Sequence, residues 1–167
     1  LEVALPSKVR ECAATNAAAS PESNQMTIRD ELPKLSSPKY RRPDVAVWVE
    51  DAQGKPVRTL AVWGKSPKYL KDLSLWWRFA GGNQALIGAV TRATRAPGKY
   101  DLVWDGKDDA GNVVAQGTYT VKVEVHREHG KHLTQSGKIP CGAADAKATL
   151  ARNDDTETTV VEYGKKK

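Results

Sequence analysis

The stretch from Lys99 to Glu124, KYDLVWDGKDDAGNVVAQGTYTVKVE, limits the possible folds more than any other part of the chain. Side chains alternate along an extended strand, and apolar residues occupy alternate positions at both ends of the stretch: Tyr100, Leu102 and Trp104, then Tyr119, Val121, Val123 and, just beyond it, Val125. The segments Asp105-Gly106, Ala110-Gly111-Asn112 and Gln116-Gly117 between them are typical of tight turns. The pattern predicts two half-buried strands, joined as a hairpin or as a β-arch.

Similar alternation predicts further strands on both sides of this stretch. Asp44–Asp51 carries valines on one face and Trp48 on the other, which indicates a central strand or one whose second face is covered. The turn at residues 52–55 would pair it with a second strand. The remaining predicted strands are Val57–Trp63, Met26–Leu32, Ala146–Leu150 and Thr158–Tyr163. The chain is therefore predicted to be all-β.

One segment has a helical period instead. In Tyr69–Ala80, apolar residues recur every three or four positions, which predicts a short amphipathic helix that ends at Gly81-Gly82. Such a helix either plugs one end of the core or stands over a pocket. In the second case Trp76 and Trp77, with Phe79, would lie beside a planar ligand, and an anion would be bound by Lys68, Lys71 and Arg78.

The other segments set the domain limits. Residues 1–24 are rich in Ala, Ser, Asn and Pro and are expected to form an irregular N-terminal arm, in which LEVALP is a candidate edge strand. Residues 25–164 form a single domain, in which Asn83–Arg95 is a loop at one end and Leu133–Pro140 is an arm. The lysines at 165–167 are expected to be a disordered tail.

Charge and composition limit the kinds of partner that the protein is expected to bind. There are 26 Lys and Arg against 20 Asp and Glu, a net charge of +6, and the basic excess lies between Pro38 and Lys99. No nucleic-acid-binding pattern accompanies it, so nucleic acid is not an expected partner. An anionic small molecule, an anionic polymer or an acidic protein would suit the charge, as would solubility alone. No apolar run is long enough to span a membrane.

The sequence contains no motif of a catalytic site, such as GxSxG, HExxH or a phosphate-binding glycine loop, so we expect a protein that is not an enzyme. Asp105, Asp108, Asp109 and Asn112 resemble part of a calcium loop, but the bidentate glutamate of such a loop is missing. Capping of the turns is the alternative role for these side chains.

Three histidines lie close together in the sequence at His126, His129 and His132. Imidazoles can bind copper or zinc, and these residues would do so only if the turn near Gly130 curls. A solvated turn is the alternative. By strand parity, His126 shares the face of Thr120, Lys122 and Glu124, which is expected to reach solvent.

Several motifs resemble those of known families. The residues Trp104-Asp105-Gly106, Asp108, Gly111, Val114 and Gly117-Thr118-Tyr119 are similar to the signature of immunoglobulin-like repeats in flagellar hook-capping proteins and other secreted bacterial proteins. Over about residues 26–164 the chain also resembles an uncharacterised family of predicted bacterial periplasmic proteins, through segments such as RPDVAVWVEDAQGKPVRTLAVWG and TRAPGKYDLVWDGKDDAGNVV. These resemblances imply an immunoglobulin-like antiparallel β-sandwich with one inserted helix, in a periplasmic protein whose signal peptide has been removed.

The periplasm is an oxidising compartment, in which the two cysteines, Cys12 and Cys141, could form a disulfide. Their separation excludes a CxxC motif. An even cysteine count in such a compartment predicts a disulfide between them, which would stabilise the fold by roughly 3 to 5 kcal/mol in the chain-entropy model. Two inert thiols are the alternative.

The family resemblance also implies a link to flavin or iron chemistry, with a membrane reductase or a flavin transferase as the partner. The family's usual segment, Asp-Ala-Val-Ser-Gly-Ala-Thr, is close to the motif on which flavin transferases attach FMN. Here the matching residues are Gly88-Ala89-Val90-Thr91-Arg92-Ala93-Thr94, so Thr94 is retained and the aspartate and glycine are not.

The predicted function is a non-catalytic periplasmic binding or accessory protein of a redox system. Its alternatives are an electron carrier with covalent FMN on Thr94, a copper or zinc protein, and an interaction module without a ligand. In the flavin alternative, Arg92 and Arg95 would offset phosphate charge near Thr94. Otherwise the loop only caps the sandwich, with Thr91 and Thr94 bonded to local backbone.

Overall fold

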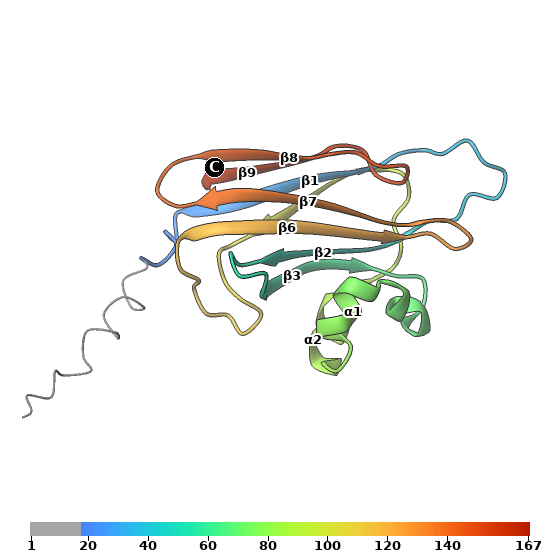
Figure 1. Ribbon diagram of the computed structural model, residues 1–167, viewed down its shortest axis with the longest axis horizontal. Helices are drawn as coiled ribbons and strands as arrows, with labels where there is room; N and C mark the ends of the chain where they lie inside the picture. The colour runs from blue at the N-terminus through green and yellow to red at the C-terminus, as the bar shows by residue number, and fades with distance from the viewer. Residues whose placement is uncertain (1–17) are drawn as a thin grey trace, which may run out of the picture.

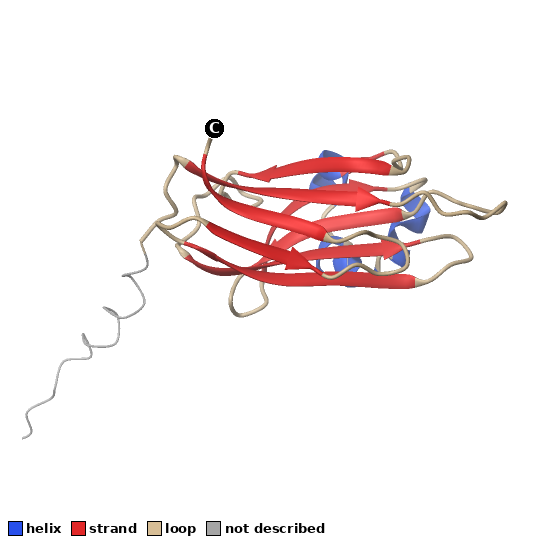
Figure 2. Ribbon diagram, turned by 90° about the horizontal axis from the view of Figure 1, so that it is seen from above, coloured by secondary structure: helices blue, strands red, loops and turns tan. Residues whose placement is uncertain are grey.

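The computed structural model describes residues 18–167, which fold into two sheets packed face to face (Figures 1 and 2). One sheet has the strand order β5-β1-β9-β8, and the other has the order β4-β3-β2-β6-β7. The bounds are β1 Asn24–Leu32, β2 Asp44–Glu50, β3 Pro56–Trp63, β4 Thr91–Arg92, β5 Gly98–Trp104, β6 Gly117–His126, β7 His132–Cys141, β8 Ala146–Leu150 and β9 Thr159–Lys165. All pairings are antiparallel except the short β3–β4 pair. The predicted all-β sandwich is confirmed.

Strand β1 lies at the centre of the first sheet although it is the first strand in sequence. Met26 is opposite Trp104 of β5 on one side and Tyr163 of β9 on the other. Every second residue of β1 is buried, because one face of the strand packs against the other sheet. Met26 and Ile28 are fully buried in this main core, between the two sheets.

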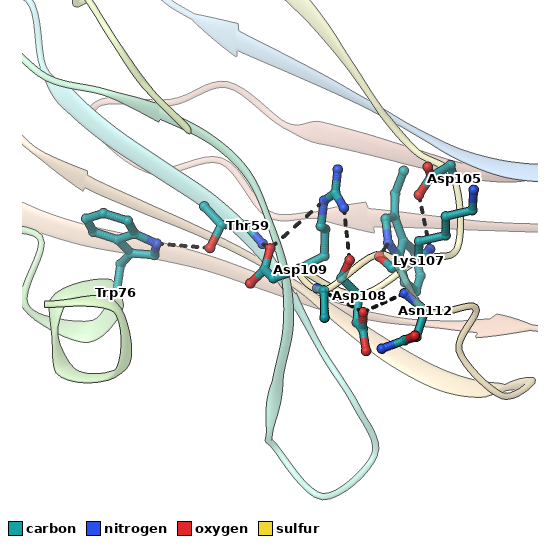
Figure 3. Close-up of polar contacts among 10 residues, drawn as sticks. Thr59, Trp76, Asp105, Lys107, Asp108, Asp109 and Asn112 are labelled. Atoms are coloured by element: carbon teal, nitrogen blue, oxygen red, sulfur yellow. Dashed lines mark hydrogen bonds and ion pairs between the residues drawn. The ribbon is translucent and has the colours of Figure 1, made fainter. Parts of the chain in front are cut away.

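The Lys99–Glu124 stretch is a β-arch, because β5 belongs to the first sheet and β6 to the second. Its turns are held by carboxylates that accept backbone N–H groups (Figure 3). Asp105 Oδ1 accepts from Lys107 N at 3.0 Å, and Asp108 Oδ1 accepts from Ala110 N and Asn112 N at 3.0 and 2.8 Å. These bonds confirm the turn-capping role and hold the pKa of Asp108 below its usual range.

Strand β2 is apolar on both faces because both faces are covered. Val45, Val47 and Val49 lie in the main core, whereas Trp48 belongs to a second core on the outer face of the same sheet. That second core is closed by the 3₁₀ helix η2 (Pro67–Asp72) and the helix α1 (Ser74–Ala80), and the helix α2 (Gln84–Val90) packs beside it. In Figure 1 the two α-helices lie below β2 and β3.

This arrangement corrects two predictions about the helix. The predicted helix Tyr69–Ala80 is divided at Leu73 into η2 and α1. It also does not plug an end of the main core, because its apolar side chains form the second core with β2 and β3. The loop expected at Asn83–Arg95 contains α2 and the short strand β4.

Leu133–Pro140 was predicted to be an arm, and this prediction is wrong. It forms most of strand β7, which pairs with β6 from His126 opposite His132 to Gly117 opposite Cys141. The inward side chains of β7 include Gln135, Ile139 and Cys141. Gln135 is polar and Gly137 has no side chain, so the sequence of β7 lacks the apolar alternation by which a strand is recognised.

The segment just before β1 lies beside the segment that follows β9. Lys165 belongs to β9, and Lys166 N donates to Ser23 O at 2.8 Å, so the prediction of a disordered tail over 165–167 is wrong for these two residues. Of the predicted arm, Ser20 N bonds to Val114 O. LEVALP and Cys12 lie outside the described residues, and with them the predicted disulfide. Burial raises the pKa of the Cys141 thiol to about 12.

A buried polar network crosses the main core. Thr159 Oγ1 lies 3.2 Å from Asp30 Oδ1 and 2.9 Å from Gln135 Oε1, and the other oxygen of Asp30 is buried without a hydrogen-bond partner in the described structure. Burial raises the pKa of Asp30, against the opposing effect of the Thr159 hydrogen bond. One hydroxyl proton cannot serve both acceptors, so the network is complete only when the side chain at position 30 carries a hydrogen-bond donor for Thr159.

Asp30→Asn is therefore expected to raise the free energy of unfolding at pH 7 by about 1 kcal/mol. Because the pKa of Asp30 is raised in the folded state, this carboxyl contributes stability that is fully present below the unfolded-state pKa of about 4. That contribution is lost as the pH rises through the folded-state pKa. The free energy of unfolding of the wild type should therefore fall relative to that of Asp30→Asn as the pH rises from about 4 to 7. Urea unfolding of both proteins at several pH values measures the difference, and a constant difference would contradict the expectation.

Candidate functional site

A cavity of about 450 Å³ lies where loops from both sheets and η2 meet. The loop between β1 and β2 contributes Tyr40, Arg41 and Arg42, and β2 begins there with Asp44. The remaining lining residues come from the segment after β3, from η2, from the loop after β4 and from the β6–β7 turn: Lys65, Tyr69, Asp72, Thr94, His126, Glu128 and His129. We call this cavity the loop-end pocket.

Two arginines of the loop-end pocket take part in no salt bridge within residues 18–167, although Asp44, Asp72 and Glu128 also line the pocket. They are Arg41 and Arg42, and both are exposed. Lys65 differs from them, because its Nζ lies 3.4 Å from Glu128 Oε2. Guanidinium groups bind carboxylate and phosphate oxygens in a bidentate manner. The two arginines therefore give the pocket an anion-binding side.

Two tyrosines supply its aromatic surface. Tyr40 is half-buried, and burial raises the pKa of its phenol although Arg127 and Arg42 oppose that change. Tyr69 is 40% exposed, with Lys68 Nζ 4.7 Å from the centre of its ring. Tyrosine rings offer flat apolar faces together with a polar hydroxyl. They suit a ligand that has a planar part beside its charge.

Two acidic side chains, Asp44 in the lining of the pocket and Asp155 outside it, hold backbone segments of its walls in place. Asp44 Oδ1 accepts the backbone N–H of Lys65 at 3.1 Å, and burial raises the pKa of this carboxyl. Arg127 Nε lies 3.1 Å from the buried carboxylate of Asp155, which anchors the start of the turn that carries Glu128 and His129. Asp44 and Asp155 thus fix the positions of the backbone segments that carry the lining side chains.

The predicted flavin loop is divided between two cavities. Thr94 lines the loop-end pocket, whereas Arg92 and Arg95 line a second cavity beside α2. The idea that these arginines offset a phosphate at Thr94 therefore lacks the geometry it needs. Thr91 Oγ1 is buried without a hydrogen-bond partner in the described part of the chain, so the predicted bond of Thr91 to local backbone is absent.

The predicted ligand-binding tryptophans pack in the protein interior. Trp76 is fully buried, and its Nε1 donates to Thr59 Oγ1 at 3.2 Å (Figure 3). Trp77 is half-buried beside it, with ring centres 6.3 Å apart. Neither lines the loop-end pocket or the cavity beside α2. A structural role for this pair fits the burial of Trp76 better than contact with a planar ligand.

The three histidines do not converge. His126 and His132 are opposite each other on β6 and β7, with ring centres 6.4 Å apart, whereas His129 is on the exposed turn with φ 60°. No group of three metal-binding side chains occurs among residues 18–167. His126 and His129 line the loop-end pocket instead.

The role of Glu124 differs from the one that strand parity predicts. This residue was assigned to a solvent-facing side of β6, but α1 covers that face and Glu124 is fully buried. Its carboxylate accepts Leu75 N at 2.8 Å and Trp76 N at 2.9 Å, and His132 Nε2 lies 2.6 Å from it. Parity placed the residue on the correct face, and only the tertiary position of α1 shows that this face is buried.

These features define a small immunoglobulin-like β-sandwich with a helical cover and a ligand-sized pocket at its loop end. The chain belongs to the family described as predicted periplasmic protein (DUF2271), whose model matches residues 25–158. This membership confirms the family resemblance and the periplasmic localisation. No helix among residues 18–167 has the length and apolar character needed to cross a bilayer.

A search of solved structures finds similarity to FlgD from P. aeruginosa. The identity is 18% and the TM-score is 0.40, with 86% of this chain and 85% of that chain covered. No curated protein matches the chain.

Proposed function

We propose that this protein is a non-catalytic periplasmic binding protein that holds a small ligand, with an anionic group and a planar part, in the loop-end pocket. The observation that carries the proposal is the pair Arg41 and Arg42, free of acidic partners in the described structure, beside Tyr40 and Tyr69. The volume of about 450 Å³ lies within the usual range of small-molecule sites. The protein acts as an accessory of an extracytoplasmic redox system.

FMN has the required chemistry, because it joins a phosphate to a planar ring system. Arg41 and Arg42 would bind the phosphate, and Tyr40 and Tyr69 would contact the ring. The cofactor would supply the electron-transfer chemistry, while the side chains of this protein only bind and orient it.

The proposal is tested by titrating the protein with FMN, riboflavin and inorganic phosphate and following flavin fluorescence and heat. FMN is expected to bind more tightly than either part alone. Arg41→Gln/Arg42→Gln should weaken FMN binding by about 100-fold or more, since it removes at least two charge-assisted hydrogen bonds of roughly 1.5–3 kcal/mol each.

The matched control is Arg92→Gln/Arg95→Gln, which removes the same charge from the cavity beside α2 and should leave FMN affinity unchanged. Equal losses in both double variants would show that net charge alone attracts the flavin, and the pocket assignment would fail. Absence of FMN binding below millimolar concentration would also overturn it.

A second candidate is covalent FMN on Thr94, favoured because Thr94 lines the same pocket as the two free arginines. In this reaction the Thr94 Oγ atom would form a phosphoester with the FMN phosphate of FAD. The pyrophosphate bond would break, AMP would leave, and a base on the flavin transferase would take the hydroxyl proton. Co-expression with a flavin transferase should then add the mass of FMN less one water to the wild type and to Thr94→Ser but not to Thr94→Ala. The same added mass on Thr94→Ala would exclude this acceptor.

A further inference from the structure

The sandwich is closed along one side and open along the other. At the closed side β7 approaches β8 so tightly that a Cβ atom at Gly137 would lie 2.6 Å from Leu150 Cδ1. At the opposite side, where β3 and β4 of one sheet face β5 of the other, a cavity of about 430 Å³ extends beneath α2. We call it the side cavity.

Part of the wall of the side cavity is an aliphatic patch, set among polar side chains that include Arg58, Thr59 and Asp109. Leu60 and Leu102 come from β3 and β5, and Leu86 and Val90 come from α2. All four are half-buried apolar residues, and Leu60 and Leu102 pack against the main core while Leu86 and Val90 pack against the second core. An apolar group placed here would therefore remove surface of both cores from water, at roughly 25 cal/mol per Å².

The rim of the side cavity is cationic. Arg92 and Arg95 line it and are exposed, and neither has an acidic partner within 4.0 Å in the described structure. The Arg95 guanidinium lies 5.8 Å from the centre of the Trp63 ring, a cation–π contact that holds it over the cavity. The third arginine, Arg58, is already engaged, because it donates to Asp108 O at 2.9 Å and lies 4.0 Å from Asp109 Oδ1.

We propose that the side cavity is a second binding site, which takes a small amphipathic carboxylate: an acidic head at Arg92 and Arg95, with an aliphatic body against Leu60, Leu86, Val90 and Leu102. Charge complementarity selects the head, and the half-buried aliphatic patch selects the body. The site is separate from the loop-end pocket. It does not depend on the function proposed for that pocket, because Thr94 faces one cavity and the two arginines face the other.

Octanoate, octanol and acetate test the two halves of this assignment. Each is titrated into ¹⁵N-labelled protein and followed by amide shifts. Octanoate is expected to shift the amides of Leu86, Val90 and Leu102 and to bind at least 10-fold more tightly than octanol, which lacks the charge, or acetate, which lacks the body. Equal affinity of octanoate and acetate would overturn the proposal, and so would equal affinity of octanoate and octanol.

Two variants locate the site. Arg92→Gln/Arg95→Gln should weaken octanoate binding by about 10-fold or more and leave octanol unchanged. Arg41→Gln/Arg42→Gln, the matched control, should leave octanoate binding unchanged. Octanoate shifts that map to the loop-end pocket would overturn the proposal.

The competing occupant is an acidic, leucine-rich segment of a partner protein. A short peptide of Glu and Leu that binds the side cavity more tightly than octanoate would assign this surface to a protein partner and overturn the small-molecule site. Weaker binding of the peptide supports the proposal. Because each site has its own pair of arginines, failure of the octanoate test leaves the FMN test intact.

Discussion

Replacing Trp76 with alanine is expected to lower the free energy of unfolding by about 4 kcal/mol. Trp76 belongs to α1 and is fully buried in the second core, where Trp48 and Leu73 are also buried. Its removal leaves a cavity that the two helical segments cannot fill without leaving the sheet. Urea unfolding followed by far-UV circular dichroism measures the loss.

Trp76→Phe separates packing from hydrogen bonding. This variant retains most of the apolar volume but loses the bond from Nε1 to Thr59 Oγ1, so a loss of roughly 1–2 kcal/mol is expected. Trp77→Ala is the positional control, because Trp77 is only half-buried, and it should cost less than Trp76→Ala. Equal losses at both tryptophans would contradict the assignment of Trp76 to the core.

Glu124→Ala is expected to lower the free energy of unfolding by about 3 kcal/mol. The substitution leaves the N–H groups of Leu75 and Trp76 without their acceptor and His132 without its partner, and buried donors without partners are expensive. A second measurement is specific to this role. The amide protons of Leu75 and Trp76 should exchange faster with solvent in Glu124→Ala than in the wild type, because the attachment of α1 to β6 is lost.

Glu128→Ala is the matched control for Glu124→Ala. Glu128 is also a glutamate next to a histidine, and it has Lys65 nearby as well, but its side chain is 49% exposed. Exposed ion pairs contribute little, so this substitution should change the free energy of unfolding by less than about 0.5 kcal/mol. A similar cost for both glutamates would show that the buried bonds to α1 carry no particular stability.

The strands that alternate clearly were predictable from the sequence. β2, β3 and β8 lie within a residue or two of their predicted bounds, and β5 and β6 contain the alternating apolar residues that predicted two strands. β7 was missed because its inward positions include Gln135, and Gln135 is buried only because its amide donates to Ala151 O and Glu157 O. These hydrogen-bond acceptors belong to segments distant in sequence from β7, so the sequence of β7 itself does not show that Gln135 is buried.

The candidate sites were predictable only in part. Thr94, Arg92 and Arg95 were identified from one short segment, but nothing in that segment shows that Thr94 lines one cavity and the two arginines line another. Arg41 and Arg42 were only part of a general basic excess. Their importance comes from their place in the lining of the loop-end pocket and from the lack of a salt bridge to either of them within residues 18–167, which are properties of tertiary structure.

The position of β1 between β5 and β9 determines the order in which the chain can fold. Residues 24–32 pair with residues 98–104 and 159–165, so the first sheet cannot be completed until nearly the whole chain is available. The β2–β3 hairpin and the β6–β7 hairpin have no such requirement. Folding dominated by such distant pairings takes milliseconds to seconds, and the second sheet with its helices is expected to form as the template on which the first sheet closes.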